Sequence, residues 1–287
     1  MLGDHFLGLY EKAMPPTLSW EERLKTARDL GFDFVEISID ETDERMERLD
    51  WNSAERKQFA DTVHQSGIRI PSLCLSCHRR YPFGSALPDN RMMAKRLMEK
   101  AIRFCSDLGI RVIQLAGYDV YYEPSTAESL QLFQEGLSHA VETAAKYQVM
   151  LAMEIMDTRL MSSITRYKTY KEQLPSPWFQ LYPDLGNLSA WGNSIEDELT
   201  IGIHDIVGIH LKDTLAVTEN FSGKFKNVPF GDGCVDFPFA FRTLEKLHYH
   251  GPYMMEMWYD PDSDWRSIIS QAKRWMDHAY QKGTLLL

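Results

Sequence analysis

Four residues that can bind a metal ion each stand at the end of an otherwise apolar run, although they lie far apart along the chain. They are Glu154, Asp184, His210 and Glu256, which together supply three carboxylates and one imidazole. Apolar runs of this length predict buried strands, and packing alone does not explain a polar residue at the end of four successive ones. Carboxylate oxygens with one imidazole suit a divalent cation such as Zn²⁺, Mn²⁺, Co²⁺ or Mg²⁺. We therefore predict that these four residues hold one such ion; the alternative is that each acid is an ordinary surface residue of a loop.

A cation bound in this way, with carboxylates beside it, is suited to proton transfer next to a carbonyl group. It can bind two adjacent oxygens of a hydroxyketone and lower the cost of removing the neighbouring carbon-bound proton. The negative charge that builds on oxygen as an enediolate forms is then stabilised by the cation. Glu154 and Glu256, the outer pair of the four, are the predicted catalytic residues, because one can take a proton from one face of the substrate while the other returns a proton to the opposite face.

A second group of residues predicts an anion site. Lys12 follows the first expected strand, and the densest basic cluster outside the expected helices follows the third. The predicted phosphate-binding or substrate-binding residues are Lys12, Ser72, Ser76, His78, Arg79 and Arg80. Guanidinium, ammonium and hydroxyl groups are suited to a phosphate dianion. The alternative is that Arg79 and Arg80 pair with the acidic segment 40–47. Glycines in the long loop 214–233 could serve a phosphate beside strands seven and eight, where barrels commonly bind one, but we interpret this loop first as a lid.

Apolar strands and amphipathic helices alternate along the whole chain and would position these residues. The expected strands are residues 7–10, 34–38, 70–75, 112–116, 149–155, 179–182, 206–211 and 253–257. The expected helices are residues 19–31, 52–67, 90–108, 125–147, 163–174, a short one from 194, 236–248 and 263–282. Eight strand–helix pairs at this length predict a closed (β/α)8 TIM barrel, as a single domain over residues 1–287, with its functional groups at the carboxyl ends of the strands. An open doubly wound sheet is the alternative, but residues 7–14 lack the glycine-rich first turn that usually accompanies it.

Composition excludes several classes of function. The net charge of −10 over 287 residues argues against a broad nucleic-acid surface, which would need a basic face. No apolar run approaches the ~18 residues of a membrane span. Residues 1–5 have neither a basic leader nor an apolar core, so we expect a cytoplasmic protein. Cys74 and Cys77 form a lone C-x-x-C without a second pair, and all four cysteines are expected to be reduced.

Several stretches, spread over essentially the whole chain, carry a resemblance to a known family. They are residues 8–13, 31–36, 40–45, 78–80 with 82–85, 114–122, 154–157, 183–184 with 186–193, 209–214, 228–231 with 233–237, and 256–258. In these stretches the chain resembles the sugar-phosphate 3-epimerases of the xylose-isomerase-like barrel superfamily, and among them the L-ribulose-5-phosphate (L-xylulose-5-phosphate) 3-epimerases of L-ascorbate and L-xylulose catabolism. The wider superfamily often has histidine at the position of Asn187.

The resemblance implies that the four predicted ligands hold the metal and that the two glutamates are an opposed acid/base pair. It also implies a phosphorylated ketopentose substrate, inverted at C3 between L-xylulose 5-phosphate and L-ribulose 5-phosphate. We further expect a homodimer, although the sequence does not single out the helices in contact. Three alternatives are an aldose–ketose isomerase for a hexulose 6-phosphate on the same scaffold, a repair endonuclease of the same superfamily, and a sugar-phosphate sensor without catalysis. The acidic charge and the single histidine at the site count against the endonuclease.

Overall fold

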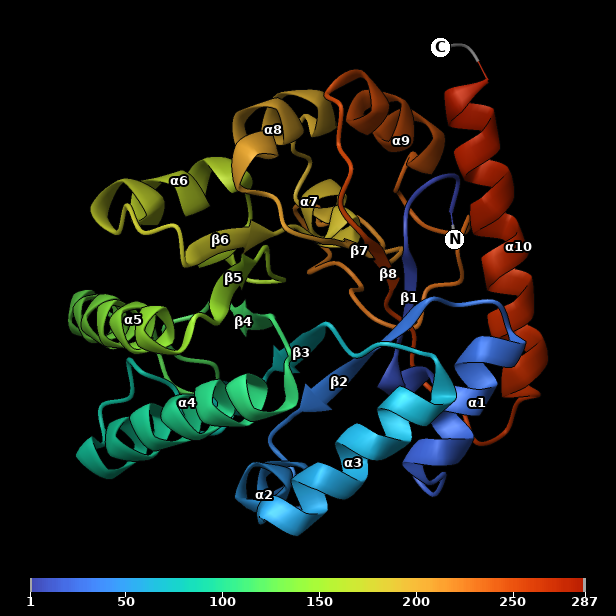
Figure 1. Cartoon of the computed structure of the whole chain (residues 1–287). Coiled ribbons are helices and arrows are strands. Elements are labelled where there is room, and N and C mark those ends of the chain that lie inside the picture. Colours follow the sequence, from blue (N-terminus) through green and yellow to red (C-terminus); the bar gives the residue numbers. More distant parts are fainter. Residues whose placement is uncertain (1, 286–287) are drawn as a thin grey trace.

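Parallel strands form a ring around the centre of the molecule, and helices cover the ring from outside (Figure 1). The computed structural model describes residues 2–285. Met1, on which the expectation about a leader segment partly rests, lies outside the described residues. The sheet has eight strands in the order β6-β5-β4-β3-β2-β1-β8-β7. Isolated parallel bridges between Leu181 and Ile206 and between Asp184 and His210 join the two outer strands of that order. The predicted barrel is therefore confirmed.

The strands agree closely with the apolar runs. They are β1 (Leu7–Tyr10), β2 (Phe34–Ile39), β3 (Ser72–Leu75), β4 (Val112–Ala116), β5 (Met150–Glu154), β6 (Phe179–Tyr182), β7 (Ile209–Leu211) and β8 (Tyr253–Met255). The third strand begins two residues later than expected, after Pro71, which has no N–H to donate to a neighbouring strand. The seventh strand is also shorter than expected, with Ile206 paired only through an isolated bridge.

The helices begin at the predicted capping residues in several cases. They are α1 (Trp20–Asp29), α2 (Asp43–Glu47), α3 (Ser53–Ser66), α4 (Pro88–Leu108), α5 (Ala127–Tyr147), α6 (Ile164–Gln173), α7 (Leu185–Ala190), α8 (Ile195–Gly202), α9 (Phe237–Lys246) and α10 (Trp265–Thr284). Ser19, Asn52 and Thr126 each accept a hydrogen bond from the first turn of the helix that follows. Gly67 and Gly109 end α3 and α4 in the left-handed conformation that favours glycine.

Two short helices lie in segments where the sequence predicted no helix. The acidic segment 40–50 contains α2, and its Arg45, together with Arg48 just after it, forms ion pairs with the buried Glu11. These pairs are tertiary contacts that local propensity does not encode. Helix α7 begins directly after Asp184, whose Oδ1 accepts the N–H of Asn187 at 2.7 Å. The interpretation of the acidic segment as a loop was wrong, and the sequence assigned residues 185–190 to no element.

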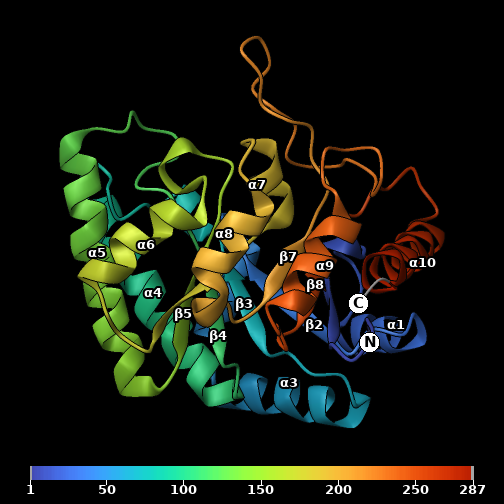
Figure 2. The same cartoon turned by 90° about the horizontal axis from the view of Figure 1, so that it is seen from above.

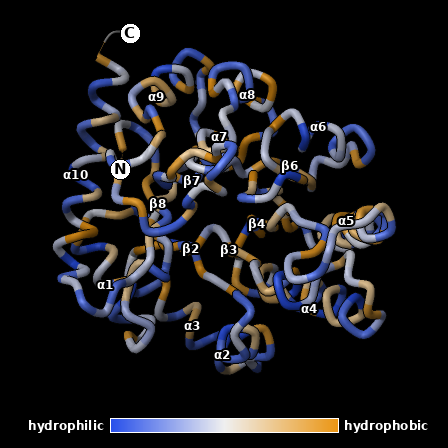
Figure 3. Tube along the Cα trace, turned by 180° about the vertical axis from the view of Figure 1, so that it is seen from behind, coloured by the Kyte–Doolittle hydropathy of each residue, from blue (hydrophilic) through white to orange (hydrophobic). Residues whose placement is uncertain are grey.

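The core lies inside the barrel and between the strands and the outer helices. Nearly all strand residues are buried, as apolar runs covered on both faces require. The tube coloured by hydropathy shows hydrophobic positions along the strands and alternating hydrophilic and hydrophobic positions along the outer helices (Figure 3). Among residues 2–285, no helix is both long enough and apolar enough to cross a membrane. The four cysteines are all free thiols.

The connection between β7 and α9 projects beyond the barrel. Within it, Leu215 pairs with Lys224 and Thr218 with Phe221 in antiparallel bridges. Figure 2 shows this narrow arm extending past the end of the barrel at which α7 lies. Because α7 follows the carboxyl end of β6, the arm stands at the end where barrel enzymes carry their functional groups. That the loop closes as a lid stays a prediction.

Candidate metal and substrate site

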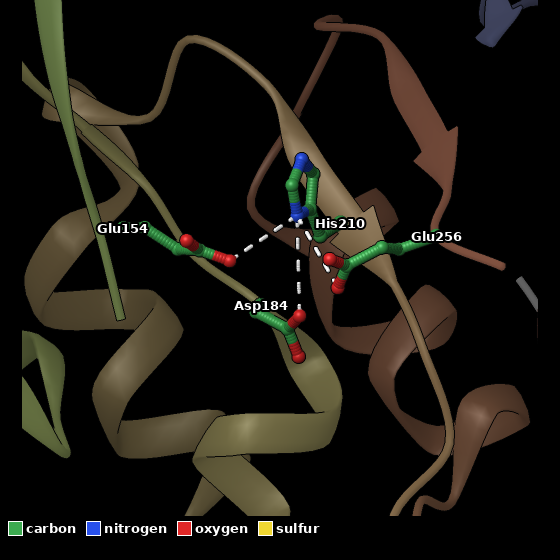
Figure 4. A group of neighbouring side chains, drawn as sticks. All are labelled: Glu154, Asp184, His210 and Glu256. Atoms are coloured by element: carbon green, nitrogen blue, oxygen red, sulfur yellow. Dashed lines mark ion pairs between the residues drawn. The ribbon is translucent and has the colours of Figure 1, made fainter. Parts of the chain in front are cut away.

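The four predicted ligand residues converge at the carboxyl ends of the strands. One ligand atom from each of Glu154, Asp184, His210 and Glu256 lies within 4.8 Å of those of the others. Nδ1 of His210 is 3.4 Å from Oε1 of Glu154, 3.9 Å from Oδ2 of Asp184 and 3.8 Å from Oε2 of Glu256. The carboxylates surround this nitrogen, with the two glutamates on opposite sides of it (Figure 4).

Strand register and one helix start bring these side chains together. Glu154 is the last residue of β5, and Glu256 directly follows β8. His210 lies in β7 and forms a parallel bridge with Asp184 just beyond β6. Asp184 uses Oδ1 to cap α7, which turns its other oxygen, Oδ2, toward the histidine. The polar residues therefore meet because parallel strands end at the same rim.

Lys212 supplies the positive charge nearest to the carboxylates. Its ammonium nitrogen lies 2.9 Å from Oδ2 of Asp184 and 3.0 Å from Oε2 of Glu256. All five side chains are almost fully buried, so water does little to screen their charges. Three carboxylates face one ammonium and one imidazole, so a further positive charge at the centre would be favourable.

Burial and neighbouring charges shift the pKa values of the three carboxylates apart. Burial raises the pKa of Asp184 to about 7, although Lys212 acts in the opposite direction. It also raises the pKa of Glu154, again against an opposing effect of His210. At Glu256 burial acts in the same sense, but the charges of Lys212 and His210 outweigh it and lower the pKa to about 2. In the cation-free protein Glu256 is thus ionised at neutral pH, while Asp184 holds a proton part of the time.

The donor set fits a divalent cation. Among residues 2–285, Nδ1 of His210 is buried and makes no hydrogen bond. Oδ2 of Asp184 and Oε2 of Glu256 are buried with the Lys212 ammonium beside them, and neither meets the geometry of a hydrogen bond. These atoms lie beside Oε1 of Glu154 around one point. Buried polar atoms without a partner are rare in native proteins and call for an explanation such as an ion. Oxygen ligands with one imidazole match Mg²⁺, Mn²⁺, Co²⁺ or Zn²⁺.

A cavity opens above the four residues at the mouth of the barrel. Its empty volume is about 460 Å³ when the solvent-open space at its mouth is included. It is lined by Tyr10, Lys12, Cys74, Ser76, Arg79, Glu154, Met156, Asp157, Asn187, Lys212, Phe225, Lys226, Glu256 and Trp258. Carboxylates lie at its base, while three of its cations lie just after β1 (Lys12), just after β3 (Arg79) and in the β7–α9 loop (Lys226). A small molecule carrying both a polar carbon skeleton and an anionic group suits this distribution of charge.

Three of the predicted anion-binding residues line this cavity. They are Lys12, Ser76 and Arg79. The guanidinium of Arg79 lies 5.1 Å from the ring centre of Tyr121 and has no hydrogen bond or ion pair with any described residue. Lys12 is held 2.5 Å from Oδ2 of Asp40. These positions leave Arg79 as the cation most available to an anionic ligand.

The other three predicted anion-binding residues lie outside the cavity lining. Ser72 is buried and donates a hydrogen bond to Oε2 of Glu36 at 2.6 Å. His78 is buried against Phe83, and burial lowers its pKa to about 4, so it is neutral. Arg80 is exposed and forms an ion pair with Asp43 at 2.6 Å, which is the pairing with the acidic segment considered above as the alternative. Although these residues are close to Arg79 in sequence, their side chains do not line the cavity that Arg79 lines.

The structure also brings residues to the cavity that the sequence did not single out as site residues. Lys226 and Phe225 reach its rim from the β7–α9 loop, and the ammonium of Lys226 lies 5.7 Å from the ring of Trp258. Asn187 donates from Nδ2 to the carbonyl of Ile155 at 2.7 Å, and its Oδ1 has no partner among residues 2–285. A lysine in a glycine-rich loop carries no periodic signal, whereas the family resemblance marks position 187, although not as a site residue of this chain.

Asp213, the residue after Lys212, accepts hydrogen bonds from the backbone at the end of the β7–α9 loop. Oδ2 of Asp213 accepts the backbone N–H groups of Gly231 at 2.8 Å and Gly233 at 3.1 Å. Oδ1 accepts that of Val235 at 3.3 Å. A Cβ at Gly233 would lie 2.0 Å from Oδ1 of Asp213, so only glycine allows this approach. Through these contacts Asp213 holds the base of the loop in place.

Comparison with known proteins gives the same fold and a group of relatives. The family model described as xylose isomerase-like TIM barrel matches residues 24–279. SgbU of Escherichia coli K12, named as a candidate L-ribulose-5-phosphate 3-epimerase, is 54% identical over 279 residues, covering 97% of this chain and 98% of that protein. The L-ribulose-5-phosphate 3-epimerase UlaE of E. coli Crooks is 51% identical over 270 residues, covering 94% of this chain and 93% of that protein.

Solved structures with much lower identity share the fold. An L-ribulose 3-epimerase aligns with a TM-score of 0.77 at 15% identity, covering 98% of this chain and 96% of that one. The 3-keto-D-glucoside 4-epimerase YcjR of E. coli aligns with a TM-score of 0.75 at 13% identity, covering 96% and 99%. The family match over most of the chain, together with the close relatives that align along nearly their full length, shows that the chain belongs to the xylose isomerase-like TIM barrel family.

Proposed function

We propose that this protein is a divalent-cation-dependent sugar-phosphate 3-epimerase that interconverts L-xylulose 5-phosphate and L-ribulose 5-phosphate. The observation that carries the proposal is the approach of Glu154 and Glu256 to one point from opposite sides (Figure 4). The relatives named as L-ribulose-5-phosphate 3-epimerases support the choice of substrate. The proposal includes a cytoplasmic homodimer, which cell fractionation and light scattering would test.

The two glutamates would perform the inversion at C3. A bound cation would polarise the ketone and stabilise the charge that builds on its oxygen. One carboxylate takes the C3 proton from its face of the substrate, and the carboxylic acid on the other face gives a proton back. Burial raises the pKa of Glu154, which makes it the stronger base of the two. Exclusion of water from this buried site keeps the intermediate from being protonated at other positions.

Other groups around the cavity would fix the substrate above the glutamates. We assign the phosphate to Arg79, Lys12 and Ser76, joined by Lys226 at the rim, because guanidinium and ammonium groups bind phosphate oxygens through charge-assisted hydrogen bonds. Oδ1 of Asn187 is buried and free to accept a hydrogen bond from a hydroxyl of the sugar. This arrangement would hold the phosphate at the opening and the carbonyl end near the carboxylates.

The position of isotope exchange tests the reaction. L-Xylulose 5-phosphate is incubated with the cation-loaded protein in D₂O, and NMR locates the deuterium. The proposal predicts deuterium at C3 together with L-ribulose 5-phosphate as product. Deuterium at C1 or C2 with an aldose product would identify an aldose–ketose isomerase. Binding without turnover would identify a sensor, and either result would overturn the epimerase.

A further inference from the structure

Glu36 is a fully buried carboxylate of β2 that does not line the substrate cavity. Burying an ionised carboxylate costs several kcal/mol unless specific partners compensate for the lost water. The side chain of Glu36 has such partners. Its Oε1 lies 3.1 Å from Nε2 of His210, and its Oε2 accepts a hydrogen bond from the hydroxyl of Ser72 at 2.6 Å. Both oxygens are therefore committed, and neither can reach a ligand in the cavity.

These contacts determine which nitrogen of the histidine faces the site. A carboxylate only accepts hydrogen bonds, so Nε2 of His210 carries the hydrogen. Nδ1 is the nitrogen that points toward Glu154, Asp184 and Glu256, and it makes no hydrogen bond with any described residue. In the neutral ring with its hydrogen on Nε2, Nδ1 holds the lone pair that a cation requires. The ring of Tyr182, with its centre 4.7 Å away, packs against the imidazole and restricts its rotation.

We propose that Glu36, itself held by Ser72, is a positioning residue that keeps His210 in the tautomer and orientation needed to bind the cation. The three residues connect β3 and β2 to β7 across the inside of the barrel. This inference rests on the cation site of the proposed function but does not depend on the identity of the substrate. In this proposal Ser72, which the sequence grouped with the anion site, instead holds the carboxylate that positions a cation ligand.

Cation binding to a set of variants separates this role from a purely structural one. The metal-free protein is titrated with Co²⁺ by calorimetry, and the visible spectrum of the bound ion follows its coordination. Glu36→Leu removes the acceptor, and loss of such a partner typically weakens metal affinity about 10- to 100-fold. Glu36→Gln keeps an amide oxygen that can accept from Nε2–H, so it restores most of the affinity. Ser72→Ala gives a smaller loss in the same direction.

A matched control accounts for the general effect of removing a buried carboxylate. Glu198 is also buried, and it is not one of the four predicted cation ligands. It accepts hydrogen bonds from the backbone N–H of Thr165 at 2.8 Å and from the hydroxyl of Thr165 at 2.7 Å. Glu198→Leu should therefore lower thermal stability while leaving Co²⁺ affinity at the wild-type value. A structural role for Glu36 would instead make its variants and the Glu198 variant behave alike in both measurements.

The possible outcomes distinguish this inference from the proposed function. Unchanged Co²⁺ affinity in Glu36→Leu overturns the role of Glu36 while leaving the epimerase proposal intact. If that variant does not fold, unchanged affinity in Ser72→Ala, or a loss in Glu36→Gln as large as that in His210→Asn, overturns it instead. A wild-type protein that binds no Co²⁺ removes the cation site itself, and the proposed function with it.

Discussion

The ammonium nitrogen of Lys212 lies 3.0 Å from Oε2 of Glu256, inside the cluster of predicted metal ligands. It is therefore the fixed positive charge that keeps this carboxylate ionised when no cation is bound. Lys212→Met should destabilise the cation-free protein by about 3 kcal/mol, because removing one partner of a buried pair leaves an uncompensated charge. Denaturant unfolding of the chelated protein measures this change. Lys25→Met is the control, since Lys25 pairs with Asp29 on the exposed face of α1 and should change stability by less than about 1 kcal/mol. Equal effects of the two substitutions would contradict the role given to Lys212.

Replacing either glutamate should remove one half of the proton transfer. Glu154→Gln and Glu256→Gln, assayed at saturating cation, should each lower kcat about 100- to 10,000-fold, the usual contribution of a positioned general acid or base. Each variant should still exchange the C3 proton of one epimer with D₂O, because the remaining carboxylate faces that epimer's C–H bond. The epimer whose C3 proton still exchanges should differ between the two variants. Exchange of both epimers by one variant would show that a single group serves both faces.

Cation binding should release protons in a pH-dependent amount. Burial raises the pKa of Asp184 to about 7, so this carboxyl is largely protonated at pH 6 and largely ionised at pH 8 in the cation-free protein. A cation that binds the carboxylate displaces the proton at the lower pH only. Affinity should therefore rise between pH 6 and pH 8, with more proton release at pH 6. Calorimetry in buffers of different ionisation enthalpy counts these protons. Greater release at pH 8 would contradict the environment assigned to Asp184.

The phosphate should be recognised by Arg79 and Lys226. Arg79→Gln and Lys226→Ala should each raise KM for the phosphorylated ketopentose about 10- to 100-fold, since a hydrogen bond to a charged group contributes ~1.5–3 kcal/mol. The same variants should hardly alter the slower turnover of the unphosphorylated ketose. Lys224→Ala is the matched control, because Lys224 lies in the same exposed loop but does not line the cavity. A similar loss of efficiency with both ketoses would argue against contact with the phosphate.

The sequence predicted the barrel and the convergence of the four ligand-type residues, because both follow from simple geometry. Parallel strands end at one rim, so ligand-type residues at the ends of β5 and β8, in β7 and just after β6 must meet. The proposed anion site was harder to predict, because the direction of each side chain decides which residues reach the cavity. His78 and Arg80 flank Arg79 in sequence, yet one is buried against Phe83 and the other reaches Asp43 on the surface. Position in an irregular turn does not determine which way each side chain points.

Two further features of the site could not be predicted from local sequence patterns. Lys226 reaches the cavity through the path of a long loop, and that path depends on the contacts of Asp213 with Gly231 and Gly233. Glu36 looks like an ordinary residue in an apolar strand, and its meeting with His210 spans 174 positions. A carboxylate within a strand expected to be buried on both faces is the one signal that could have marked it.

Turnover measured as a function of bound cation tests the central claim most directly. The protein is stripped with a chelator and titrated with Mn²⁺ or Zn²⁺, while metal content and conversion of L-xylulose 5-phosphate are followed together. The account predicts no turnover in the stripped protein, folded as judged by circular dichroism, and full recovery at one ion per chain. His210→Asn should bind the ion much more weakly and recover little. Undiminished turnover in the stripped protein would contradict the account.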